Sequence, residues 1–124
     1  MAYIDGFLTP VPRDKKHQYL DWARATGSAF LELGARRIVE SWEDDLAYDT
    51  VLDFRRALQA QDDESVVFSW IEWPDKKTRD EAWAKVREPA RSDADDTPPM
   101  PIEPMRVIYG GFAPILTLDP PNPR

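Results

Sequence analysis

The chain has 124 residues, of which 42% are apolar and 31% charged, so it fits one globular domain with a modest core. Its net charge of -7 disfavours non-specific binding to nucleic acid, and the absence of cysteine excludes disulfides and thiolate metal ligands. The longest strongly apolar run, residues 66–71, is too short to cross a membrane, and no secretory leader is visible. We therefore expect a cytoplasmic protein without membrane contact, metal or other cofactor.

The first third of the chain has the pattern of a strand followed by a helix. Residues 2–11 are extended and apolar, with prolines where the strand should end. Residues 14–33 repeat apolar side chains every three or four positions, which is typical of a helix, and Gly34 suits its left-handed C-terminal cap. A glycine within this helix, Gly27, predicts that a neighbouring element packs closely there.

Two further strands are expected in the middle of the chain. Residues 35–44 predict one strand, on which Ile38, Glu40 and Trp42 share a face. Residues 45–63 form a long connection that contains a short helical turn. Residues 64–73 give the clearest strand signal, with apolar side chains on both faces, so both faces should be covered.

The last third of the chain predicts a helix and a final strand. The helix is expected between Pro74 and Glu88. Residues 89–104 are rich in Pro, Asp and Ser and read as a loop, and residues 105–113 read as a strand. Residues 114–124 form a proline-rich tail.

The order strand, helix, strand, strand, helix, strand predicts one α+β domain over residues 1–113. It is the ferredoxin-like βαββαβ pattern, with a four-stranded antiparallel sheet in which the first and third strands are central and the fourth lies beside the first. Similar Gly-Phe segments, which begin at Gly6 and Gly111, agree with neighbouring strands. Two helices cover only one face of such a sheet, so we expect a homodimer through the other face, as in dimeric α/β barrels.

Four blocks of sequence, in order along the chain, carry a family pattern. They are Tyr3–Leu8 with Pro10–Pro12, Gly34-Ala35 with Glu40 and Asp44-Asp45, Glu64–Trp70, and Met100-Pro101 with Arg106 and Ile108–Phe112. Together they resemble the DUF1428 family of small proteins of unknown function. The resemblance implies a dimeric ferredoxin-like fold and no settled activity. Some relatives carry an RNA-binding label, and the net charge of -7 disfavours that alternative here.

Asp5 is the most informative polar residue, because a carboxylate in a central strand is costly to bury unless it is paired. Two roles are open for it. It could be a catalytic base, with Tyr109 as proton donor. It could instead have a structural role, in which it pairs with an arginine such as Arg37 or Arg106 or accepts hydrogen bonds from backbone N–H groups. The structural role is favoured.

The aromatic residues suggest a ligand pocket, since related dimeric barrels hold small ligands between sheet and helices. The pocket candidates are Asp5, Trp42, Trp70 and Tyr109, and core packing is the alternative for the tryptophans. The single histidine, His17, is expected on the surface. The leading hypothesis is a binder of a small apolar or aromatic molecule. The alternatives are a cofactor-independent monooxygenase or isomerase, an RNA-binding protein and a protein-interaction module.

Overall fold

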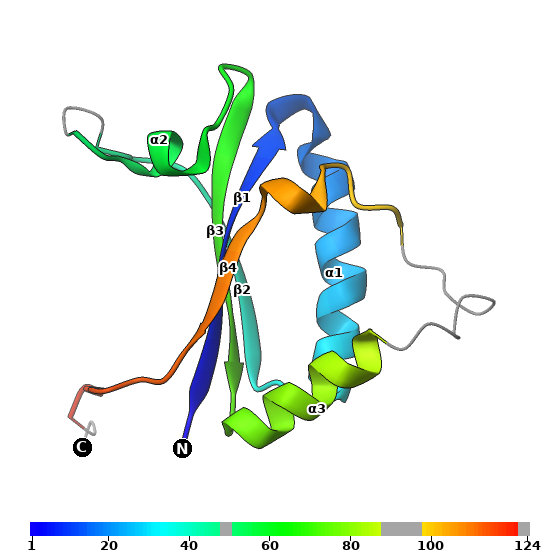
Figure 1. Ribbon diagram of the computed structural model, residues 1–124, viewed down its shortest axis with the longest axis vertical. Coiled ribbons are helices and arrows are strands. Elements are labelled where there is room, and N and C mark those ends of the chain that lie inside the picture. Colours follow the sequence, from blue (N-terminus) through cyan, green and yellow to red (C-terminus); the bar gives the residue numbers. More distant parts are fainter. Residues whose placement is uncertain (48–50, 88–97, 122–124) are drawn as a thin grey trace.

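The computed structural model describes residues 1–47, 51–87 and 98–121. Four strands in this part of the chain form one antiparallel sheet, and they are β1 (Tyr3–Pro12), β2 (Arg37–Trp42), β3 (Glu64–Trp73) and β4 (Ile108–Phe112). The sheet order is β2-β3-β1-β4. As predicted, β1 and β3 are central and β4 lies beside β1 (Figure 1).

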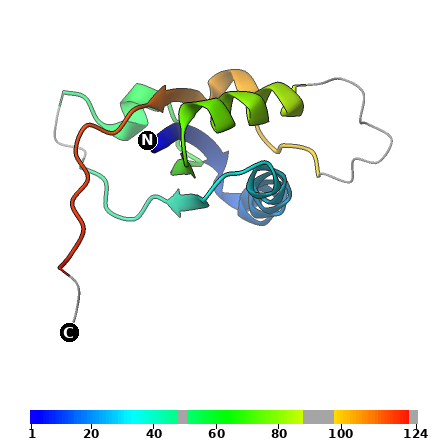
Figure 2. The same cartoon turned by 90° about the horizontal axis from the view of Figure 1, so that it is seen from below.

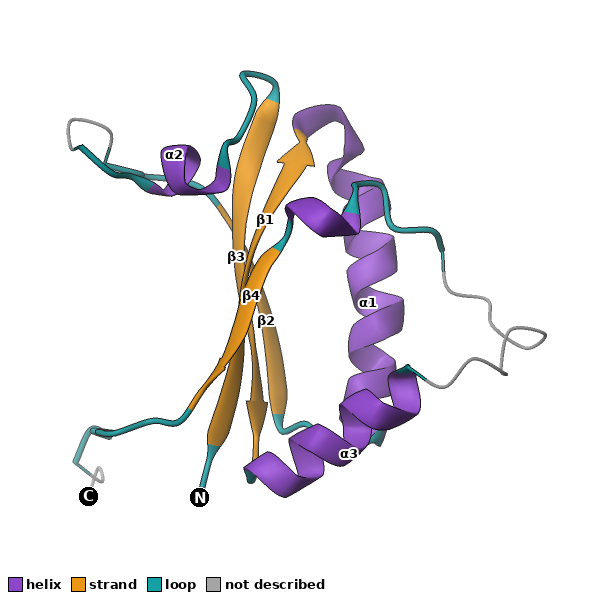
Figure 3. Ribbon diagram, viewed as in Figure 1, coloured by secondary structure: helices purple, strands orange, loops and turns teal. Residues whose placement is uncertain are grey.

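Two long helices cover one face of the sheet. These are α1 (Lys16–Glu32) and α3 (Lys76–Val86), whereas the short α2 (Phe54–Leu58) lies on the opposite side (Figure 3). Seen from below, α1 is almost end-on and α3 runs across it (Figure 2). Short 3-10 turns at Arg13–Lys15 and Pro104–Arg106 precede α1 and β4. Residues 89–97 of the expected loop lie outside the described residues, as does residue 88 at the end of the expected helix.

The first strand runs through both of its prolines, although the sequence placed its end there. β4 pairs with β1 only from Ile4 to Leu8. Beyond Leu8, the side of β1 that β4 would occupy therefore has no partner strand. Pro10 and Pro12 have no backbone N–H group, and on this unpaired side no such group is needed for a ladder hydrogen bond.

The core lies between the sheet and the two long helices. It consists of two clusters, one formed by Phe30, Ala35, Ile71, Trp73 and Ala82 and the other by Val11, Tyr19, Ala23 and Val67. The Phe30 ring meets the Trp73 ring edge-on, with 5.9 Å between centroids. This geometry is favourable for aromatic pairs and fixes α1 against β3.

Two glycines fix how α1 ends and packs. Gly34 has φ +113, a conformation that side chains disfavour, and it ends the helix as predicted. A Cβ on Gly27 would lie 3.3 Å from the Ile38 Cδ1 atom. The helix therefore packs closely on β2 at this point, as the sequence predicted.

Candidate functional site: a cavity between sheet and helices

A cavity of about 720 Å³ lies between the sheet and helices α1 and α3. Its apolar lining includes Phe7, Trp22, Phe30, Leu33, Ile38, Ile71, Trp83 and Tyr109. Its polar lining includes Thr9, Tyr19, Glu40 and Ser69. A volume of this size, with a mainly apolar lining and a few polar groups, is typical of sites that hold small organic molecules.

Strand register arranges four of these residues in a row across the sheet. Glu40 of β2 pairs with Ser69 of β3, Ser69 pairs with Phe7 of β1, and Phe7 pairs with Tyr109 of β4. The side chains of paired residues lie on the same face, so the row is polar at one end and aromatic at the other. The rings of Phe7 and Tyr109 are stacked, with centroids 6.2 Å apart, and the Trp83 ring lies 6.5 Å from Phe7.

A phenol and a carboxylate meet at the polar end of the row. Tyr19 of α1 is 2% exposed and donates its hydroxyl proton to Glu40 Oε1 at 2.7 Å. Burial raises the pKa of the Tyr19 phenol, and the negative charge of Glu40 raises it further. The phenol therefore stays neutral and remains a donor to Glu40 at physiological pH.

Glu40 is exposed on β2, and it lines the cavity. Partial desolvation by the surrounding protein raises the pKa of Glu40, and hydrogen bonds from the hydroxyls of Tyr19 and Ser69 offset part of that effect. No salt bridge between described residues includes Glu40. The cavity thus contains a carboxylate that faces it without an ion-pair partner in the described part of the chain.

Glu40→Gln should become more stable relative to the wild type as the pH rises above 4.5. The raised pKa means that folded protein holds the Glu40 proton more tightly than the unfolded chain, whose ordinary pKa is 4.5. The stability that protonated Glu40 contributes is therefore complete below 4.5 and lost as the pH rises towards the folded value. Urea unfolding of both proteins across this range measures the difference. A pH-independent difference would contradict the raised pKa.

Asp5 lies under α3 and outside the cavity lining. It is 3% exposed, and its Oδ2 atom accepts hydrogen bonds from Trp73 Nε1 at 2.9 Å and from Trp83 Nε1 at 2.8 Å. Arg79 Nε donates to Asp5 Oδ1 at 3.0 Å, and Arg79 Nη2 forms an ion pair with the same atom at 2.8 Å. The carboxylate is thus both charge-paired and hydrogen-bonded, which is the condition for burying it.

The arginine partner of Asp5 differs from both expected residues. The sequence suggested Arg37 or Arg106, and this expectation was wrong, because Arg79 on α3 occupies the position. Arg37 pairs with Glu72 at 2.8 Å on the opposite face of the sheet. Arg106 pairs with a buried glutamate at one end of the sheet, described below.

The remaining pocket candidates lie in different places. Tyr109 lines the cavity and is 66% exposed. Trp70 borders the cavity, but its ring contacts Phe68 at 5.6 Å and its Nε1 donates to Glu72 at 2.9 Å. Phe68 and Glu72 lie on the face of β3 that points away from the long helices, so the Trp70 ring lies on that face too.

Trp42 is outside the lining of the large cavity. The Lys16 Nζ atom lies 4.8 Å from its ring centroid, and Trp42 borders a separate pocket of about 190 Å³. His17 is exposed on α1, where the sequence placed it. Of the four pocket candidates, Tyr109 and Trp70 border the large cavity, with the Trp70 ring on the other face of the sheet, and Asp5 and Trp42 lie outside its lining.

Four residues of the polar lining were not expected at a site from the sequence, and they are Glu40, Tyr19, Ser69 and Thr9. One signal was available for Glu40, because it is a carboxylate between Ile38 and Trp42 on an otherwise apolar strand face. Tyr19 belonged to the apolar stripe of its helix and read as core. It is indeed core, except that its hydroxyl reaches the cavity floor.

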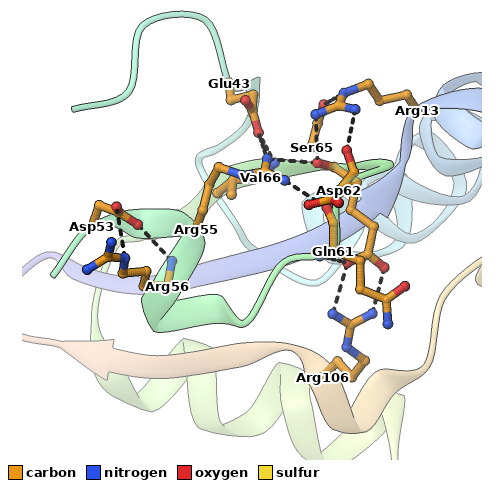
Figure 4. Close-up of polar contacts among 11 residues, drawn as sticks. Arg13, Glu43, Asp53, Arg55, Arg56, Gln61, Asp62, Ser65, Val66 and Arg106 are labelled. Atoms are coloured by element: carbon orange, nitrogen blue, oxygen red, sulfur yellow. Dashed lines mark hydrogen bonds and ion pairs between the residues drawn. The ribbon is translucent and has the colours of Figure 1, made fainter. Parts of the chain in front are cut away.

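A second polar cluster holds the start of β3. Glu64 is 4% exposed, and Arg106 donates to its two carboxylate oxygens, from Nη1 to Oε2 at 2.6 Å and from Nη2 to Oε1 at 2.9 Å. Arg13 and Arg55 donate to the Glu64 carbonyl at 3.1 and 2.8 Å (Figure 4). Three arginines from separate segments therefore converge on one turn, and the cluster is structural.

The fold and the cavity define a small α+β protein with a mainly apolar cavity between its sheet and its two long helices. The family model described as "Protein of unknown function (DUF1428)" matches residues 2–104, so the chain belongs to this family and the resemblance seen in the sequence is confirmed. It is similar to the uncharacterized protein YbaA of Escherichia coli (strain K12), with 44% identity over 117 residues that cover 94% of this chain and 98% of YbaA. YbaA of Shigella flexneri gives the same values. Among the described residues, the helices are too short or too polar to cross a bilayer.

Proposed function

We propose that this protein is a homodimer that binds a small, largely apolar molecule in the cavity between its sheet and helices. The protomer is of the ferredoxin-like type, because its sheet order read from β4 is 4-1-3-2 and neighbouring strands are antiparallel. The proposed location is the cytoplasm, since a chain without cysteine suits a reducing compartment.

One observation carries the ligand-binding proposal, and it is the cavity of about 720 Å³. The cavity is partly open to solvent, since its lining residues Tyr109 and Val86 are exposed, so a small molecule can enter it. Aromatic rings of Phe7, Trp83 and Tyr109 form one part of its wall, and hydroxyl and carboxylate groups form another. Such a lining suits a molecule with a ring-sized apolar body and one polar group.

The uncovered face of the sheet supports the dimer. Phe68 and Ile108 flank Leu8 in one register row, and they are 47% and 46% exposed, while the nearby Phe112 is 63% exposed. α2 covers only part of this face, through Phe54 against Phe68 with ring centroids 6.3 Å apart. A second copy would cover the rest by a two-fold interface.

Native mass spectrometry of gently purified protein tests both halves of the proposal. We expect a mass near twice 14.3 kDa, with additional mass from a retained molecule. A monomer at micromolar concentration would overturn the dimer. A dimer without additional mass would leave the binding half to the titration that follows.

Val86→Trp is expected to weaken binding of ethylbenzene, a small apolar probe, by about tenfold. Val86 lines the cavity from the last turn of α3 and is partly exposed, so the larger side chain can enter the cavity without replacing a core residue. Ala84→Trp is the matched control, because Ala84 is exposed on the same helix and outside the lining. NMR titration measures both affinities, and equal affinities would place ethylbenzene outside the cavity.

The catalytic alternative, with Asp5 as base and Tyr109 as proton donor, has less support than binding. Asp5 accepts hydrogen bonds from Arg79 and from two indoles, and it does not line the cavity. A base needs access to its substrate, and these contacts favour the structural role. The RNA-binding alternative gains nothing from a chain with a net charge of -7.

A further inference from the structure

The cavity contains one feature that a purely apolar ligand would not use. Glu40 is the only acidic residue among the described residues that line it. The Tyr19 hydroxyl holds one carboxylate oxygen at 2.7 Å, and Tyr19 is itself fixed in the core. The carboxylate therefore has a defined position on the cavity floor and keeps acceptor capacity for a further donor.

The charges around Glu40 favour a cation in the cavity. Glu40 takes part in no salt bridge with another described residue. The basic lining residues, Lys85 and Arg87, lie near the end of α3, where the Arg87 guanidinium lies 5.6 Å from the Trp83 ring centroid. Neither of them forms a salt bridge with Glu40. The net charge of -7 further favours the approach of a positive ligand.

The rings near the carboxylate also suit a cation. The Tyr19 and Trp22 rings, with centroids 5.6 Å apart, line the cavity beside Glu40. The Phe30 and Trp83 rings also line it, and they pack against each other with centroids 4.8 Å apart. Aromatic faces attract ammonium groups, and they also bury the apolar body that carries such a group. A carboxylate that accepts N–H hydrogen bonds and aromatic faces that attract positive charge together suit a protonated amine.

We propose that the cavity selects a molecule with a protonated amine on an aromatic or similarly apolar body, and that Glu40 is the residue that binds the amine. The inference rests on the proposed function, because it names the ligand class of the same cavity. Tyr19 is a positioning residue, which orients the Glu40 carboxylate. The raised pKa of Glu40 agrees with this, since its carboxylate lacks favourable partners that an ammonium group would supply.

Three probes with one carbon frame test the inference. Phenethylamine, phenethyl alcohol and ethylbenzene are titrated into the full-length protein, and NMR follows the indole signals of Trp22 and Trp83, which line the cavity. We expect phenethylamine to bind most tightly and ethylbenzene most weakly. Glu40→Gln should reduce the affinity for phenethylamine by about tenfold and leave ethylbenzene unchanged.

Glu81→Gln is the control for the loss of one negative charge. Glu81 is exposed on α3, pairs with Lys77 and lies outside the cavity lining, so its replacement should change no affinity. If the three probes bind wild-type protein equally, or if Glu40→Gln binds phenethylamine as the wild type does, the inference fails and the apolar cavity stands. If none of the probes shifts the indole signals, both the inference and the proposed function fail. Unchanged ethylbenzene binding shows that the Glu40→Gln cavity is intact.

Discussion

Asp5→Ala is expected to lower the free energy of unfolding by about 3–5 kcal/mol, the usual cost of breaking a buried ion pair by removing one partner. The substitution leaves the Arg79 guanidinium and the indole N–H groups of Trp73 and Trp83 without their shared acceptor. Trp73 is fully buried, so water cannot easily replace the lost bond. Urea unfolding monitored by tryptophan fluorescence measures the loss.

The control for this substitution uses the same arginine. Arg79 Nη1 also contacts the Asp80 carboxylate at 3.0 Å, but Asp80 is exposed to solvent. Asp80→Ala should therefore change stability only slightly, as exposed ion pairs usually do. Asp5→Asn should fall between the two, because the amide keeps one acceptor oxygen and places N–H groups against the donors. If Asp5→Ala were as mild as Asp80→Ala, the buried network would not hold α3 on the sheet.

Much of the fold was predictable because successive side chains of a strand point alternately to the two faces of the sheet. This alternation placed Ile38, Glu40 and Trp42 on one face of β2, and the register of the sheet agrees with that. It also identified a central strand at residues 64–73 with two apolar faces, of which one is covered by the long helices. These features depend on local geometry, because side chains of a strand point alternately to either face whatever the rest of the chain does.

Partners across elements were not predictable in the same way. Asp5 had to be paired if it was buried, and the sequence could say that much. Arg79 lies 74 residues away on α3, and its selection over other arginines depends on where that helix crosses the sheet. The Tyr19–Glu40 contact likewise depends on how α1 is rotated above β2. The volume of the cavity depends on the separation of helices and sheet, which no residue pattern encodes directly.

Glu64→Gln is expected to lower the free energy of unfolding by about 1–3 kcal/mol at neutral pH. The Arg106 guanidinium donates to both oxygens of the buried Glu64 carboxylate, and a glutamine presents only one acceptor oxygen. The expected effect is smaller than that of Asp5→Ala because glutamine keeps one acceptor oxygen for Arg106, whereas alanine at position 5 leaves Arg79 and the Trp73 and Trp83 indoles without their acceptor.

The stability of Glu64→Gln relative to the wild type should also depend on pH. The Arg106 hydrogen bonds hold the pKa of Glu64 below its ordinary value of 4.5. The stability that ionised Glu64 contributes is therefore complete above 4.5 and is lost as the pH falls towards the folded value. The difference in free energy of unfolding between wild-type protein and Glu64→Gln should therefore decrease as the pH falls. For Glu40→Gln the variant instead gains on the wild type as the pH rises.

Glu103→Gln separates the effect of the ion pair from that of charge in general. Glu103 is exposed and lies near Arg106, so its loss removes the same charge without removing the two hydrogen bonds. We expect its unfolding curve to follow the wild type through the acid range. If Glu103→Gln and Glu64→Gln lost equal stability, Arg106 would stabilise the fold only through the overall negative charge around it, and its two hydrogen bonds to Glu64 would add nothing. The three-arginine cluster would then not be what fixes the turn before β3.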